Sequence, residues 1–269
     1  MKNKYFVLLV IILSLVVSYV IYEYIFGAPA NFKDAARHEP VTDQGGFVNL
    51  MGTVYTGGYI VAVLVSLILM VVTFGIERVI SLQRARGRGP VETFAKRVQN
   101  HVEAGNIDAA VDECNKQRGS AASILKAGLE QYKMAKKDPA LNSEQRLAEV
   151  KRAIDEATGL ESPMLEKNLI VLSTIASIAT MLGLLGTTVG MIRAFQALAT
   201  SGQAASAVQL SIGISEALIN TAAGLVGAVL AIVLYNIFTN KVDAFLYTIE
   251  EASLSVQELL AIREAGDTK

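Results

Sequence analysis

The sequence has little charge, one cysteine and no tryptophan. Only 18% of its 269 residues are charged, whereas roughly 25% is usual for a soluble domain. The 24 basic residues are nearly matched by 25 acidic ones, so the composition gives no signal for nucleic-acid binding. These features exclude a disulfide scaffold, a disordered tail protein and a collagen-like repeat. They indicate a membrane protein with one sizeable aqueous portion.

The residues that usually carry catalysis or metal binding are also scarce. Cys114 lies in a charged helical stretch and is expected to be a reduced, partly buried thiol. His38 and His101 are isolated, so we expect both to be solvated surface residues. No nucleophile–base pair, metal-ligand cluster or nucleotide-binding loop is present. The sequence therefore predicts that the protein is not an enzyme and binds neither a metal ion nor another cofactor.

Four apolar runs cover residues 5–22, 56–76, 168–192 and 217–240. Each of the last three exceeds 20 residues, and about 20 helical residues cross a hydrocarbon core of about 30 Å. Only helices satisfy their own backbone groups in lipid, and the alternation of a barrel is missing. The prediction is an all-α membrane protein whose long transmembrane helices extend into the cytoplasm.

Basic residues set the orientation of these runs. The segment 77–167 carries 16 of the 24 basic residues and is expected on the cytoplasmic side, with both termini. The predicted order is listed here: a transmembrane helix (1–26), a periplasmic segment (27–55), a transmembrane helix (56–78), a cytoplasmic helical domain (79–167), a transmembrane helix with a pore face (168–198), a periplasmic linker (199–209), a second such helix (210–240) and a cytoplasmic C-terminal helix (241–269). The aliphatic stretch 61–72 predicts that the second span faces lipid.

The first run has two interpretations. Lys2 and Lys4 with the small residues of 28–30 resemble a signal peptide and its cleavage site. The apolar run is longer than the roughly 7–15 residues of a signal-peptide core, which favours a retained helix.

The cytoplasmic segment is expected to be helical. Pro90 suits a first helical position, and Gly105 followed by Asn106 indicates a stop and a new start. Asn142 and Gln145 form a capping-box pattern that opens a helix expected to continue past Pro163 into the third span. The basic residues Arg84, Arg86 and Arg88 either hold anionic lipid head groups or serve only as orientation signals.

The third and fourth runs contain small residues that suit close helix packing. Gly186 and Gly190 form a small-xxx-small pair. The glycines expected to pack the two helices together are Gly183, Gly186, Gly190, Gly224 and Gly227.

A short linker makes these two runs an antiparallel hairpin with its apex near Ala204. Thr187 and Thr221 each lie 17 residues from that apex, so we expect them at the same depth inside the bilayer. Arg193 and Glu216 pair in the same way, roughly 9 Å nearer the outer surface at 1.5 Å per residue. Glu216 is either part of a salt bridge that fixes the hairpin or part of an ion pathway. No acid lies deeper in the hairpin, and threonine does not titrate usefully, so a central titrating group must come from another polypeptide.

Six short motifs, at the spacing expected for the family, resemble the ExbB/TolQ/MotA family, and ExbB in particular. They are LEKNL (165–169), LGLLGT (182–187), GMI (190–192), ISEAL (214–218), GLV (224–226) and YN (235–236). The resemblance implies a pentameric helical channel in a bacterial inner membrane. The pore would enclose a dimer of an ExbD-like single-span partner, and proton flow would move that partner. The motion would energise a TonB-like protein and outer-membrane transport.

Carried over residue by residue, the resemblance implies pore threonines at Thr187 and Thr221 and a hairpin glutamate at Glu216. The chain departs from the family pattern at Thr180 and Thr188 and in its additional first span and outside segment. These departures leave the proton-channel assignment intact and concern the subfamily. Two alternatives to an ExbB-type motor stay open. One is a TolQ-like or gliding-type motor with another periplasmic client, and the other is a membrane scaffold that conducts nothing.

Overall fold

The computed structural model describes residues 4–33, 40–41, 49–200 and 203–267. Nearly all of these residues are helical, and the one strand-like pairing among them is an antiparallel bridge between Phe32 and Pro40. Four helical stretches are long and apolar enough to cross a membrane. The all-α prediction is therefore confirmed for the described residues. They form two compact units, 1–76 with 170–236 and 77–169 with 237–269.

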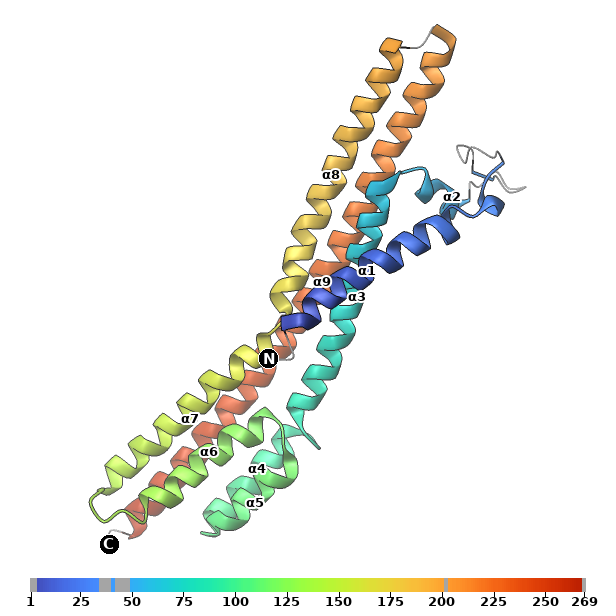
Figure 1. Cartoon of the computed structure of the whole chain (residues 1–269). Helices are drawn as coiled ribbons and strands as arrows, with labels where there is room; N and C mark the ends of the chain where they lie inside the picture. Colours follow the sequence, from blue (N-terminus) through green and yellow to red (C-terminus); the bar gives the residue numbers. More distant parts are fainter. Residues whose placement is uncertain (1–3, 34–39, 42–48, 201–202, 268–269) are drawn as a thin grey trace. The chain divides into compact units, whose positions relative to one another are not determined.

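The first unit contains a helical hairpin. Its arms belong to α8 (Leu169–Thr200) and α9 (Gln203–Asp267), which run side by side in opposite directions (Figure 1). Both helices enter the segment 199–209 that the sequence predicts as a linker. Three of the seven residues in 203–209 are alanine, the strongest helix former, which accounts for the difference.

The N-terminal helix of the first unit packs on α3 (Tyr59–Arg86). It consists of α1 (Lys4–Val20) and one π-helical segment, η1 (Ile21–Phe26). Ser18 Oγ donates a 2.7 Å hydrogen bond to the carbonyl of Ala62. The hydroxyl of Tyr22 donates to the carbonyl of Tyr55 at 3.1 Å, and the two rings stack with centroids 4.6 Å apart.

This packing corrects the expectation that 61–72 faces lipid. Val61, Leu64 and Val71 are buried, whereas Val63 and Val72 remain exposed. The aliphatic composition could not separate the two faces, because a helix side covered by other helices needs the same residues as a side covered by lipid.

The segment 27–58 joins η1 to α3. It contains the 3-10 turn η2 (Pro29–Asn31) and α2 (Leu50–Tyr55). The Asn49 side chain caps α2 by accepting from the backbone amides of Met51 and Gly52, and its Nδ2 donates to Asn31 Oδ1 at 3.1 Å.

The second unit is built mainly from amphipathic helices: α4 (Val91–Glu103), α5 (Ile107–Gln117), α6 (Ser120–Ala135) and α7 (Ser143–Glu166). Gly105, with φ of +79°, separates α4 from α5 as predicted. Pro90 is the residue before the first helical position rather than that position itself. The predicted capping box is confirmed, since Asn142 and Gln145 bond each other's backbone amides.

The predicted continuous helix from 142 into the third span is wrong. Pro163 is accommodated inside α7, but the helix ends at Glu166 and α8 begins at Leu169. Asn168 has φ of +65°, a conformation that asparagine tolerates better than most residues. Its Nδ2 donates to Glu77 Oε2 at 3.2 Å, and the buried Arg78 donates to the carbonyl of Leu165 at 3.1 Å. These long-range hydrogen bonds stabilise the interruption between α7 and α8.

Candidate ion-pathway site

Small residues allow the two arms of the hairpin to approach closely. A methyl group built on Gly183 would lie 3.2 Å from Gly224 Cα, and one on Gly190 would lie 2.9 Å from Ala217 Cβ. A Cβ at Gly186 would overlap the side chain of Asn220. At these three positions a larger residue would force the helices apart.

Gly227 lies in a less crowded place than the other glycines of the hairpin. A methyl group there would be 3.4 Å from Ile68 and 3.5 Å from Ala179, which is close to ordinary contact. Its role in helix packing therefore has less geometric support.

The two threonines predicted at equal depth bond to helix carbonyls. Thr187 Oγ1 donates to the carbonyl of Leu184 at 2.6 Å. Thr221 Oγ1 lies 3.3 Å from the carbonyl of Ala217 and 3.5 Å from that of Gly183 on the facing helix. Each hydroxyl thus uses its proton within the hairpin and keeps lone pairs that can accept a hydrogen bond.

Arg193 and Glu216 are brought together by the hairpin. Arg193 Nη1 lies 2.5 Å from Glu216 Oε1, and their side chains are 57% and 12% exposed. Gly58 lies beneath the carboxylate, since a Cβ there would be 2.9 Å from Glu216 Oε1. With φ of +77°, Gly58 is also a position that favours glycine. The carboxylate is therefore enclosed by α8 on one side and by the turn before α3 on the other.

Sequence reasoning missed Asn220, the most buried polar residue of the hairpin. It is 0% exposed, and its Nδ2 donates to the carbonyl of Gly57 at 2.9 Å. Its Oδ1 has no hydrogen-bond partner within the described part of the chain. The available signal was an amide side chain in an apolar helix, four residues after Glu216 and therefore on the same helix face.

Comparison with known proteins assigns the family. A model described as the MotA/TolQ/ExbB proton channel family matches residues 116–251, slightly more than half of the chain. The chain belongs to this family. The match contains the whole hairpin, with Thr187, Arg193, Glu216 and Thr221, whereas α1 and α3 lie outside it.

Individual relatives come from two branches of the MotA/TolQ/ExbB family. The Tol-Pal system protein TolQ of Pseudomonas aeruginosa is 36% identical over 118 residues, which are 44% of this chain and 51% of TolQ. The biopolymer transport protein ExbB of Pseudomonas putida is 28% identical over 167 residues, 59% of this chain and 47% of that protein. ExbB of Salmonella typhimurium is 31% identical over 132 residues, 49% of each chain. The chain spans about half the length of the curated relatives it matches.

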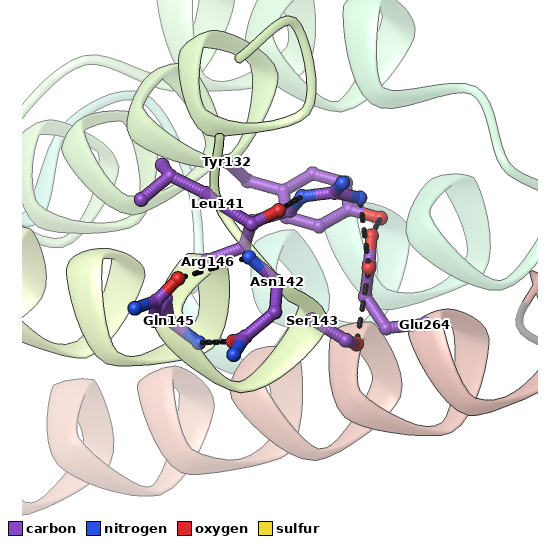
Figure 2. A network of polar contacts seen from close by, with 7 residues as sticks. All are labelled: Tyr132, Leu141, Asn142, Ser143, Gln145, Arg146 and Glu264. Carbon is purple, nitrogen blue, oxygen red and sulfur yellow. Dashed lines mark hydrogen bonds and ion pairs between the residues drawn. The ribbon is translucent and has the colours of Figure 1, made fainter. Parts of the chain in front are cut away.

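A second polar cluster, also missed by sequence reasoning, lies in the second unit. Glu264, near the end of α9, is almost fully buried and accepts from Tyr132 Oη at 2.8 Å, Ser143 Oγ at 3.1 Å and Arg146 Nη1 at 3.2 Å (Figure 2). Arg146 also donates to the carbonyl of Leu141 at 3.2 Å. Through these hydrogen bonds and the Arg146–Glu264 ion pair, the cluster connects the end of α9 to α6 and α7. Its role is structural.

The sequence also directed attention to Cys114, the two histidines and the basic residues of 84–88. Burial raises the pKa of the Cys114 thiol to about 12, so the thiol is unreactive at neutral pH. His101 is half-buried rather than fully solvated, and His38 lies outside the described residues. Among the residues that the structure describes, no group of three or more metal-ligating side chains occurs. Arg84, Arg86 and Arg88 are exposed, and their proposed contact with lipid stays a prediction.

Proposed function

We propose that this chain is the proton-channel subunit of an inner-membrane motor. In the proposed mechanism, a pentamer of this chain encloses a dimer of an ExbD-like single-span partner, and proton flow moves that partner. The movement then energises a TonB-like protein and, through it, outer-membrane transport. Both termini are cytoplasmic.

One observation carries the proposal. The hairpin contains hydroxyls that accept hydrogen bonds at Thr187 and Thr221 and an ion pair nearer its apex, yet no acid lies deeper than Glu216. Such a surface can receive a protonated carboxyl group but cannot supply one. A partner that carries a membrane carboxylate completes the pathway, with Glu216 supporting its outer part.

The energy available sets a requirement on the mechanism. Each charge that crosses the membrane releases about 2.3 kcal/mol per 100 mV. Several protons are therefore needed for each substantial movement of the partner.

A second candidate is a TolQ-like motor with another periplasmic client. The identity of 36% with TolQ of Pseudomonas aeruginosa favours it over a gliding-type motor. The channel chemistry would be the same, and only the proteins reached through the partner would differ.

Native mass spectrometry of the complex, extracted gently from its own membrane, tests the proposal. We expect five copies of this chain with two copies of a single-span protein that has an aspartate in its membrane segment. Co-purifying TonB-like or Tol-Pal proteins would then decide between the two candidates. A monomer or dimer with no such partner would favour the non-conducting scaffold instead.

A further inference from the structure

Within the part of the chain that the structure describes, the side-chain oxygen of Asn220 accepts no hydrogen bond. The side chain is fully buried, and its Nδ2 is occupied by the carbonyl of Gly57. The opposite amide orientation would direct Oδ1 at that carbonyl oxygen, so the orientation is fixed. Oδ1 has no partner among the described residues. Buried polar atoms are almost always hydrogen-bonded, so this oxygen calls for a donor.

The surroundings limit where that donor can come from. The backbone of α8 at Gly186 lies directly against Asn220, because a Cβ at that glycine would overlap the asparagine side chain. The carbonyl of Gly57 covers the amide nitrogen. Asn220 therefore has no room to turn its oxygen toward solvent.

Glu216 is the neighbour that can become a donor. It lies four residues before Asn220, so the two side chains are on one face of α9, a helical turn apart. Both contact the same turn: Asn220 bonds Gly57, and Glu216 Oε1 lies against Gly58. An ionised carboxylate only accepts hydrogen bonds, whereas a protonated carboxyl group has one O–H to donate.

We propose that Asn220 Oδ1 accepts a hydrogen bond from Glu216 when Glu216 is protonated. Glu216 then has two states: ionised and paired with Arg193, or protonated and bonded to Asn220. In the step between them a proton from the outer water binds a carboxylate oxygen and the ion pair with Arg193 opens. This inference rests on the proposed function, in which Glu216 belongs to the proton pathway.

The groups that face Glu216 are compatible with such a switch. Arg193 comes from α8, and with 57% of its side chain exposed it can leave the pair and be solvated. Tyr22 of η1 donates its hydroxyl proton to the carbonyl of Tyr55 and adds no positive charge. The turn before α3 contributes backbone only, through Gly57 and Gly58. Asn220 is thus a positioning residue for the protonated state.

Infrared titration of the full-length chain in lipid nanodiscs tests the switch. The band of protonated Glu216 is identified by its loss in Glu216→Gln. In the near-isosteric variant Asn220→Leu, we expect this band at higher frequency and Glu216 about two- to tenfold less protonated at the same pH, as befits one lost hydrogen bond. The matched control is Thr239→Val on the same helix, where another buried unpaired oxygen is removed. It should leave the band unchanged.

A second readout does not depend on the folding of Asn220→Leu. In protein with 13C-labelled asparagine side chains, acidification should shift one amide carbonyl band, and Glu216→Gln should abolish that shift. The inference would be overturned if the Glu216 band is the same in wild type and Asn220→Leu. It would also be overturned if acidification does not shift any asparagine carbonyl band. Neither readout requires a partner or proton flux. If the complex conducts no protons and yet shows both infrared signals, the proposed function is refuted and the hydrogen bond between Glu216 and Asn220 still stands.

Discussion

Arg193 Nη1 lies 2.5 Å from Glu216 Oε1, with one charge on each arm of the hairpin. More than half of the arginine side chain is exposed, while the glutamate is largely covered. Exposed ion pairs contribute little to folding, but an uncompensated charge among apolar helices is expensive. We therefore expect the pair to influence the protonation state of Glu216 more than the stability of the hairpin.

Replacing Arg193 should separate function from stability. We expect Arg193→Gln to change the free energy of unfolding by less than about 1 kcal/mol, because Glu216 can take up a proton and bond Asn220 instead of staying charged. Proton flux should fall clearly, because Glu216 loses its ionic partner. Thermal unfolding and flux in proteoliposomes measure the two effects. Arg152→Gln, which removes an exposed ion pair on α7, is the control and should change neither. Normal flux in Arg193→Gln would leave the pair with a structural role at most.

Close packing at Gly186 can be tested with a matched glycine. Gly186→Ala places a methyl group onto Asn220, and overpacking of this kind typically destabilises a protein by about 1–3 kcal/mol. Gly159→Ala on α7 has open space around its new methyl group and should stabilise by roughly 0.5–1 kcal/mol. Denaturation in mild detergent, followed by circular dichroism, compares them. Equal effects of the two variants would show that the arms are not tightly apposed.

The polar cluster around Glu264 predicts a strong effect on the stability of the second unit. Glu264→Ala leaves Tyr132, Ser143 and Arg146 without their shared acceptor, and we expect a loss of about 1–3 kcal/mol. Glu258→Ala, at an exposed position on the same helix, should be close to neutral. Hydrogen exchange should show the loss in α6 and α7. Unchanged protection there would mean that the cluster does not hold α9 in place.

Burial of Cys114 predicts a definite pH dependence. The pKa of the thiol is raised from 9.0 to about 12 in the folded chain, so alkylation by iodoacetamide should be slow up to high pH and fast once denaturant is added. Because the pKa is higher in the folded state, this contribution to stability is present below pH 9.0 and declines as the pH rises toward 12. Rapid alkylation of the native protein near neutral pH would contradict the buried position.

The sequence predicted those features that depend on local pattern. Apolar runs located the four membrane-competent helices, Gly105 predicted the end of α4, and Asn142 with Gln145 predicted the start of α7. The equal depth of Thr187 and Thr221 in the bilayer stays a prediction. The short connection between two apolar runs also predicted that Arg193 and Glu216 lie close together, and their ion pair confirms this. Counting residues was sufficient because both arms are regular helices.

The features that sequence reasoning missed depend on contacts between distant segments. The break at Asn168 requires Glu77, 91 residues earlier, and the bond of Asn220 to Gly57 spans 163 residues. Glu264 and Tyr132 are 132 residues apart. Nor could aliphatic composition show that α1 covers one face of α3, since buried and lipid-facing sides use the same residues.

Proton flux through the purified complex with its single-span partner, reconstituted into proteoliposomes, is the decisive measurement for the proposed channel. With an imposed membrane potential, we predict that the wild-type complex acidifies the lumen and that a complex with Thr187→Val and Thr221→Val assembles normally but conducts little. Thr248→Val, which removes a similar carbonyl-bonded hydroxyl elsewhere on α9, should conduct like wild type. Undiminished flux in the double variant, with intact assembly, would contradict a pathway along the hairpin threonines.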